Sequence, residues 1–169
     1  SDAISVLNFG TQVTIMGSVV SADTSRVLFG SGTAGYLGES LSPATTRYNN
    51  PFQAVHDSVT GDYIVADYSN SRVRSVLSSD STTRLIAGGA TQRYATNAGQ
   101  GLVQANQEKM SQIRGLAYDQ ITGELFMADS ANNRIRVTSR FGEVTQAVGT
   151  GALGSGAEEN EYPTNATMS

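Results

Sequence analysis

The sequence predicts an all-β fold assembled from a tandem repeat, and three observations support this prediction. The segment "DSVTGDYIVADYSNSRVR" (57–74) aligns without gaps with "DQITGELFMADSANNRIR" (119–136), with identical residues at eight of the eighteen positions. Apolar runs of strand length recur inside each copy and are separated by short turns. Glycine accounts for 18 of the 169 residues, and no segment longer than one turn favours a helix.

Each copy contains four expected strands, beginning with "PFQAVHD" (51–57) and "IRGLAYD" (113–119). A tight turn follows each of them, in which Gly61 and Gly123 supply the positive φ that such turns often need. The second strands are the continuous apolar runs in "DYIVAD" and "ELFMAD". Such runs are typical of strands that are buried on both faces.

The third strands, "RVRSVL" (72–77) and "RIRVTS" (134–139), alternate polar and apolar residues, so each has one apolar face. The fourth strands, "TRLIAG" and "VTQAVG", end at glycine clusters. Four strands joined by short turns form the meander of a β-propeller blade. We therefore expect a second blade at 51–89 and a third blade at 113–151.

The remaining segments predict the edges of this array. Residues 19–30 resemble residues 76–88, so 1–30 is expected to be an incomplete blade of three strands that begins with a second strand. Residues 152–169 are expected to form an inter-blade loop that leads to a missing strand. Closed propellers have four to eight blades, and this single partial propeller has about three. It is therefore either a fragment of a six-bladed propeller or a chain that closes the ring as a homodimer.

The run "ADYSNSRVR … TTRLIAGG", with its partner "ADSANNRIR … TQAVGTG", resembles the NHL-repeat β-propeller family. In that family the second strand ends in Ala-Asp, the following turn carries Asn-x-Arg, and the fourth strand ends in Ala-Gly or Gly-x-Gly. The resemblance covers about residues 13–160 and is weakest over the first blade. It implies a propeller that serves as a protein-binding platform, as an RNA binder or, in some members, as an enzyme.

The recurring signature residues are expected to act as a structural clamp in each blade. Aspartate ends one strand, asparagine lies in the turn, and arginine begins the next strand, so a hairpin places the three near one another. The alternative is a ring of arginine and asparagine side chains that face a ligand. The residues concerned are Asp67, Asn70, Arg72, Asp129, Asn132 and Arg134.

Tyrosines are expected to mark the binding face. Five of the seven tyrosines fall in loops that share one face of a propeller: Tyr36, Tyr48, Tyr68, Tyr94 and Tyr162. Tyrosine among glycine, serine and asparagine is typical of recognition surfaces. The alternative is that these rings seal one blade against the next.

Composition argues against several classes of function. The net charge of −4 and the pI near 4.9 argue against nucleic-acid binding, unless arginines gather on one face of the folded module. No apolar run is long enough to insert into a membrane. A single lysine beside ten arginines, with many Ser and Thr residues, slightly favours an extracytoplasmic domain.

We expect no bound cofactor and no metal. The glycine motifs "GSGTAG" (30–35) and "GTGALG" (149–154) match a dinucleotide fingerprint, but no helix is predicted after them to hold a phosphate. The chain has one histidine, His56, and no cysteine, and a metal site needs more ligands than that. The sequence therefore predicts a non-catalytic interaction module that binds an unidentified protein or peptide. The alternative is part of a metal-dependent hydrolase or lyase whose other ligands lie outside this chain.

Overall fold

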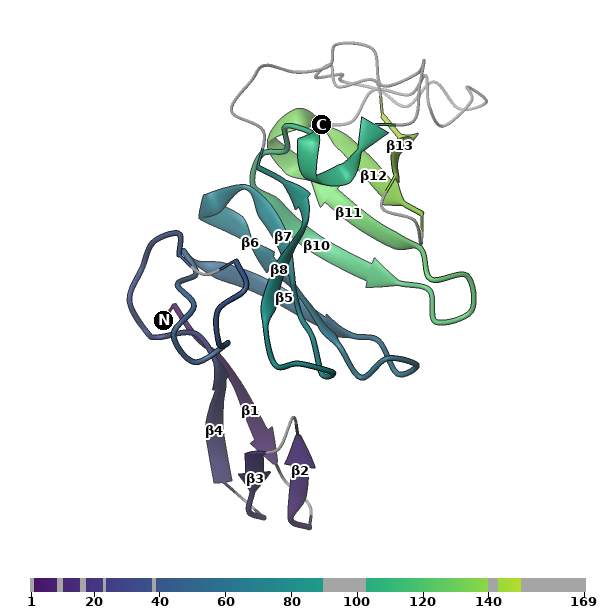
Figure 1. The fold of residues 1–169 in the computed structure, drawn as a ribbon. Helices are drawn as coiled ribbons and strands as arrows, with labels where there is room; N and C mark the ends of the chain where they lie inside the picture. Colours follow the sequence, from purple (N-terminus) through teal and green to yellow (C-terminus); the bar gives the residue numbers. More distant parts are fainter. Residues whose placement is uncertain are drawn as a thin grey trace.

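The chain is all-β in the computed structural model, which describes residues 2–8, 11–15, 18–22, 24–37, 39–89, 103–139 and 143–149. Antiparallel strands form the sheets, and short 3-10 helices occupy some of the connections (Figure 1). Two larger sheets lie side by side, and a smaller sheet at the N-terminal end precedes them in the chain.

The second and third sheets are the predicted repeat. The second sheet has the order β5-β6-β7-β8, and the third has the order β10-β11-β12-β13 with the short strand β9 added beside β13. The second-sheet strands are β5 (Pro51–His56), β6 (Tyr63–Asp67), β7 (Arg72–Val76) and β8 (Thr83–Gly88). The third-sheet strands are β9 (Val103–Gln104), β10 (Ile113–Tyr118), β11 (Leu125–Asp129), β12 (Arg134–Thr138) and β13 (Glu143–Val148).

Equivalent turns join the strands in the two sheets. The carboxylates of Asp57 and Asp119 accept hydrogen bonds from the backbone N–H groups two and three residues later in the chain. These bonds shape the turn after the first strand of each sheet. Gly61 and Gly123 close these turns with φ values of 79° and 74°, as predicted. The 3-10 helices η1 (Tyr68–Asn70) and η3 (Ser130–Asn132) join the second strand to the third, and η2 (Ala105–Gln107) follows β9.

The first sheet differs from the expected three-strand arrangement. It pairs β1 (Ile4–Asn8) with β4 (Thr24–Phe29), whereas β2 (Val13–Ile15) and β3 (Ser18–Val20) form a separate hairpin at its far end (Figure 1). In the first sheet, the pair Ile4–Phe29 is followed by a register shift between β1 and β4. In the second sheet, the pair Val73–Ala87 is followed by the same kind of shift between the third and fourth strands. By this register β1 is the equivalent of a third strand, not of a second strand.

A glycine in the left-handed region explains this pairing. Gly30 follows β4 with φ = 98°, and Gly88 at the end of β8 has φ = 76°. A Cβ on Gly30 would lie 2.6 Å from the backbone oxygen of Asp2, and a Cβ on Gly88 would collide with the backbone oxygen of Ser71. Each glycine therefore lets the fourth strand pack closely on the residue that precedes the third strand.

Apolar side chains fill the two spaces between neighbouring sheets. One cluster joins the first sheet to the second and contains Phe29, Tyr48, Val65 and Val76. The other joins the second sheet to the third and includes Ile64, Ala66, Val73, Ala87, Ile113, Leu116, Leu125 and Met127. Successive residues of β6 thus point to opposite neighbours, and this strand is buried on both faces as its sequence predicts.

The outer face of the third sheet is less covered than its counterpart in the second sheet. Ile64, Ala66 and Val73 are buried against the third sheet. At the equivalent positions, Phe126, Ala128 and Ile135 are only half-buried. Among the described residues, this apolar face is therefore less completely buried than its counterpart.

Amide side chains connect the neighbouring strands β5 and β10. The Gln53 side chain accepts a hydrogen bond from the Leu116 N–H (2.8 Å) and donates one to the Leu116 carbonyl oxygen (3.0 Å). Gln120 donates to the His56 carbonyl oxygen and accepts from the N–H and hydroxyl of Ser58. These bonds take the place of a backbone ladder between the two sheets.

Candidate functional site

The second and third sheets have two distinct ends. We call one the loop end, which comprises residues 31–37, 39, 47–50, 68–71, 108–112 and 130–133 with the adjoining ends of the strands. We call the other the turn end, which comprises residues 57–62, 77–82, 119–124, Ser139 and Glu143. The antiparallel meander separates them, because the β6–β7 turn lies at the opposite end from the β5–β6 and β7–β8 turns.

The signature aspartate organises the loop end in each sheet. Asp67 is fully buried and accepts hydrogen bonds from the Asn49 backbone N–H (2.8 Å) and the Asn70 side-chain amide (2.9 Å). Asp129 is likewise buried, and it accepts from the Ser111 backbone N–H and the Asn132 amide. The aspartate therefore ties the segment before the first strand to the turn after the second.

The arginine that reaches this aspartate is not the expected one. Arg72 pairs with Asp67 in the strand register, but the salt bridge to Asp67 comes from Arg74, at 3.5 Å. In the third sheet Arg136, instead of Arg134, contacts Asp129 at 3.3 Å. Long side chains can reach a diagonal neighbour across a pair of strands, which explains the shift by two residues.

Both buried arginines have a second carboxylate partner from the preceding loop. Arg74 lies 3.3 Å from Glu39 and also donates to the Arg47 and Leu37 carbonyl oxygens. Arg136 lies 3.3 Å from Glu108, and both of these side chains are about 2% exposed. Sequence reasoning missed these glutamates, although the identical pair Arg74/Arg136 in the repeat was a signal for the arginines.

The predicted tyrosines have different environments. Tyr36 is 44% exposed, and the Arg72 guanidinium lies 3.9 Å from the centre of its ring. Tyr68 is half-buried in η1. Tyr48 is fully buried, and burial raises the pKa of its hydroxyl to about 12. The expectation that Tyr48 forms part of a binding surface is therefore wrong, because its ring packs between the first and second sheets. Tyr94 and Tyr162 lie outside the described residues.

Tyr68 belongs to an aromatic–arginine surface that the sequence analysis did not identify. Its ring centre lies 5.9 Å from that of Phe52, which is 60% exposed. The Arg114 guanidinium lies 5.5 Å from the Tyr68 ring and donates to the Tyr68 hydroxyl at 3.3 Å. Phe52 and Arg114 occupy equivalent second positions in β5 and β10, so the two adjacent strands bring them together.

Charge is segregated between the two ends of these sheets. The described turn end carries Asp57, Asp62, Asp80, Asp119, Glu124 and Glu143, together with one basic residue, Arg84, which pairs with Asp80 at 2.8 Å. The described loop end carries the basic residues Arg47, Arg72, Lys109, Arg114 and Arg134 in addition to the two buried arginines. Its carboxylates, other than Asp2, pair with the buried arginines. The described part of the loop-end surface is therefore basic although the chain is acidic.

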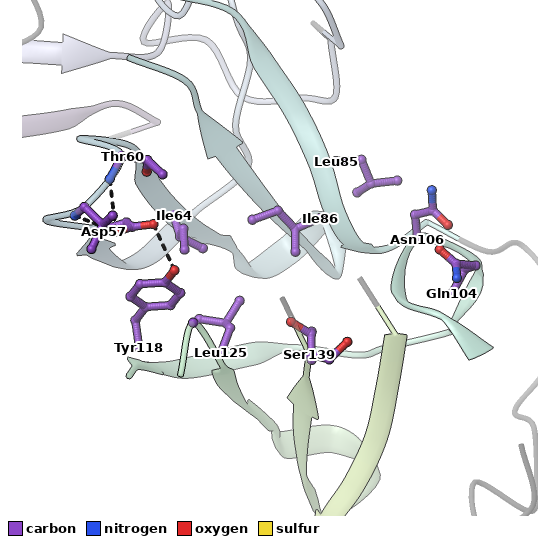
Figure 2. A pocket seen from close by; sticks show the side chains of 13 residues that line it. Asp57, Thr60, Ile64, Leu85, Ile86, Gln104, Asn106, Tyr118, Leu125 and Ser139 are labelled. Atoms are coloured by element: carbon purple, nitrogen blue, oxygen red, sulfur yellow. Dashed lines mark hydrogen bonds between the residues drawn. The ribbon is translucent and has the colours of Figure 1, made fainter. Parts of the chain in front are cut away.

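A cleft of about 650 Å³ lies between the second and third sheets (Figure 2). Ile64, Leu85 and Ile86 form one side, Leu125 and Ser139 lie opposite, and Gln104 and Asn106 close one end. Of the thirteen lining residues, Asp57 alone carries a charge. The Tyr118 hydroxyl donates to Asp57 at 2.8 Å. The volume of this cleft is typical of small-molecule sites.

Asp57 is held in its ionised form at this cleft. Burial acts to raise its pKa, but hydrogen bonds from the Val59 N–H, the Tyr118 hydroxyl and the Thr60 side chain and N–H outweigh this effect. The pKa of Asp57 therefore lies below its ordinary value.

The first glycine motif uses its N–H groups within its own loop. Gly30 donates to the Pro43 carbonyl oxygen and Gly35 to that of Tyr48, at 2.9 Å and 3.1 Å. No helix occurs in the described part of residues 31–50. Of the second motif, only Gly149 lies within the described residues.

The described residues contain no group of three or more His, Asp or Glu side chains that could hold a metal ion. His56 lies exposed on β5, with its ring 4.7 Å from that of Tyr63. Within the same part of the chain, no helix is both long and apolar enough to cross a membrane.

Comparisons with known proteins bear on the fold alone. No protein-family profile matches the chain, and no curated protein matches it in sequence. Among solved structures, the chain is similar to a protein of unknown function from Bacteroides thetaiotaomicron, with a TM-score of 0.55 and 17% identity over 73% of this chain. It is also similar to an auxiliary nutrient binding protein from Bacteroides ovatus, with a TM-score of 0.56 and 16% identity over 86% of this chain. The chain spans 30% and 32% of the length of these two proteins.

Proposed function

We propose that this chain is part of an NHL-type β-propeller and acts as a non-catalytic interaction module that binds a protein or peptide through its loop end. In this proposal each of the two larger sheets is one blade, and β5 and β10 are innermost strands next to the propeller axis. The observation that carries the proposal is the exposed surface formed by Phe52, Tyr68 and Arg114. Aromatic and arginine side chains contribute most of the binding energy at many protein interfaces.

The framework beneath this surface supports a binding role. Asp67 fixes the β6–β7 turn that carries Tyr68, and the Asn70 amide also donates to the Gly35 carbonyl oxygen at 2.8 Å. The Ser69 N–H donates to the Asn49 carbonyl oxygen. Because the backbone is held from several sides, the exposed rings lose little freedom when a partner binds.

Selection from a random peptide library displayed on phage tests the proposal. The wild-type chain is the target, and a loop-end variant, Phe52→Ser with Tyr68→Ser, is used for counter-selection. A turn-end variant, Val59→Ser with Ile121→Ser, is the matched control because both residues are highly exposed, at 71% and 90%. We expect enriched peptides that bind the wild type and the control but not the loop-end variant. Failure to enrich any peptide with this dependence would refute the proposal.

We also propose that two copies of the chain pair to close a ring of six blades. The support is the half-buried apolar face of the third sheet, which carries Phe126 and Ile135. A two-fold axis would place the first sheet of each copy on the third sheet of the other.

A further inference from the structure

The proposed function leaves open which partner the loop end recognises, and the charges there restrict the answer. Arg72 and Arg114 are held against aromatic rings, Arg72 on Tyr36 and Arg114 on Tyr68. Among the described residues, no carboxylate lies within 4.0 Å of Arg47, Arg72 or Arg114. These guanidinium groups are therefore ordered but not neutralised by the described chain.

The contacts within the described chain leave terminal N–H donors of these arginines without a partner, and the buried Arg72 Nε is not counted among them. A guanidinium has five N–H donors. The described contacts use one on Arg114, to the Tyr68 hydroxyl, and one on Arg72, to the Asn70 carbonyl oxygen. The remaining donors suit a carboxylate, which accepts two parallel hydrogen bonds from a guanidinium.

A hydrogen bond joins the two segments that carry these arginines. Arg72 follows Ser71, and the Ser71 hydroxyl accepts a hydrogen bond from the Gln112 N–H, two residues before Arg114. Phe52 adds an exposed apolar ring beside Tyr68 in the same area. The surface thus combines two ordered cations with one apolar contact.

We propose that the loop end recognises an acidic peptide segment of a protein partner: Arg72 and Arg114 bind its carboxylates, and the Phe52–Tyr68 pair contacts an apolar side chain beside them. This inference rests on the proposed function and specifies its ligand. Complementary charge gives such an interface its specificity and a faster association rate.

The same observations favour an acidic peptide over a nucleic acid. A long polyanion would also meet the six carboxylates of the described turn end, whereas a short peptide touches the basic end alone. Single-stranded nucleic acids need free aromatic faces for base stacking. Arginines lie over both Tyr36 and Tyr68, at 3.9 Å and 5.5 Å from the ring centres, which leaves Phe52 as the exposed ring of the described surface without an arginine over it.

Fluorescence anisotropy with a labelled peptide, Glu-Glu-Phe-Glu-Glu, tests the proposal on the full chain. We expect binding that weakens as the salt concentration rises, and about ten-fold weaker binding for Arg72→Gln and for Arg114→Gln. The matched control is Arg84→Gln, because Arg84 is an exposed arginine at the turn end and its removal should leave the affinity unchanged. The peptide Glu-Glu-Ser-Glu-Glu should bind more weakly than the probe, because it lacks the apolar side chain.

Each other outcome overturns the inference. The proposed carboxylate contacts do not exist if the acidic probe fails to bind or if Gln-Gln-Phe-Gln-Gln binds with the same affinity. They are also excluded if Arg84→Gln loses as much affinity for the probe as the loop-end variants. Tighter binding of a ten-residue oligouridine that depends on Arg114 would assign the face to nucleic acid instead. Arg114→Gln should remain folded because Arg114 is an exposed side chain, and its melting curve verifies this.

The phage selection separates this inference from the proposed function. If the peptides that depend on Phe52 and Tyr68 are neutral or basic, the acidic specificity is wrong while the loop end remains a binding face. If no peptide depends on these residues, both proposals fail.

Discussion

Arg74 and Arg136 show how single residues stabilise the loop end. Each guanidinium is almost completely buried, and each has two carboxylate partners. A buried ion pair contributes little relative to an apolar pair, but removal of one partner leaves a buried charge without compensation. Replacement of Arg74 or Arg136 should therefore lower the free energy of unfolding more than replacement of Arg72 or Arg134.

Replacement of Arg74 tests this difference. Arg74→Ala should lower the free energy of unfolding by about 3–5 kcal/mol, because Asp67 would remain buried without its guanidinium. Arg72→Ala should cost about 1 kcal/mol or less, since Arg72 stacks on the half-exposed Tyr36 and forms no salt bridge within the described residues. Urea unfolding of both variants provides the comparison. Equal losses would show that Arg74 is not the principal partner of Asp67.

Tyr48 gives a prediction at alkaline pH. Burial raises its pKa from the ordinary value of 10.0 to about 12. The folded state therefore keeps this proton at a pH where the unfolded chain has released it. The resulting stability is fully present below about pH 10 and is lost as the pH rises towards 12. Tyr48→Phe should reduce the fall in melting temperature between about pH 9 and pH 11. A variant with the same alkaline slope as the wild type would contradict this prediction.

At the scale of the element, side-chain amides hold neighbouring sheets together where no backbone ladder exists. Gln53 on β5 bonds both backbone groups of Leu116 on β10, and Leu116 is buried. Buried backbone groups that lose their partners cost more than the hydrogen bonds themselves contribute.

Gln53→Ala should therefore lower the free energy of unfolding by about 1–3 kcal/mol and expose the Leu116 amide to hydrogen exchange. Gln120→Ala is the matched control, because the bonds of Gln120 are exposed and water can replace them, whereas those of Gln53 to Leu116 are partly buried. Its cost should be smaller, and exchange at Leu116 should stay slow. Rapid exchange at Leu116 in the wild type would disprove the role of Gln53.

The repeat made most elements of the second and third sheets predictable from the sequence. Strand length, the two buried faces of β6 and the turns at Gly61 and Gly123 follow from apolar periodicity and turn chemistry. The first sheet was not predictable in the same way, because the β2–β3 hairpin separates β1 from its partner β4. Its pairing becomes clear only from the register beside Gly30.

The candidate site was less predictable than the fold. Alternation along β7 places Arg72 and Arg74 on the same face, so periodicity could not decide which of them contacts Asp67. The aromatic–arginine surface brings together Phe52, Tyr68 and Arg114 from three elements, and only the packing of β10 beside β5 and η1 shows that they meet. Burial of Tyr48 likewise depends on the position of the first sheet.

At the scale of the whole molecule, apolar residues of the first and third sheets stay partly exposed among the described residues. Phe126 and Ile135 are half-buried, whereas their counterparts Ile64 and Val73 are buried by the next sheet. Val27 of the first sheet is 54% exposed. Repeated sheets of this kind gain stability mainly from contact with their neighbours, so uncovered faces favour association.

Pairing of two chains through these faces gives the last prediction. Two contacts related by a two-fold axis would cover both edges, and a closed assembly of this kind does not grow into a filament. Light scattering at micromolar concentration should therefore give about twice the 17.7 kDa mass of one chain. Phe126→Glu should shift the mass to that of the monomer, because it places a charge in the proposed contact. Ile121→Glu, on a side chain that is 90% exposed in a turn of the same sheet, should leave the dimer intact. A wild-type chain that stays at 17.7 kDa would exclude closure by pairing.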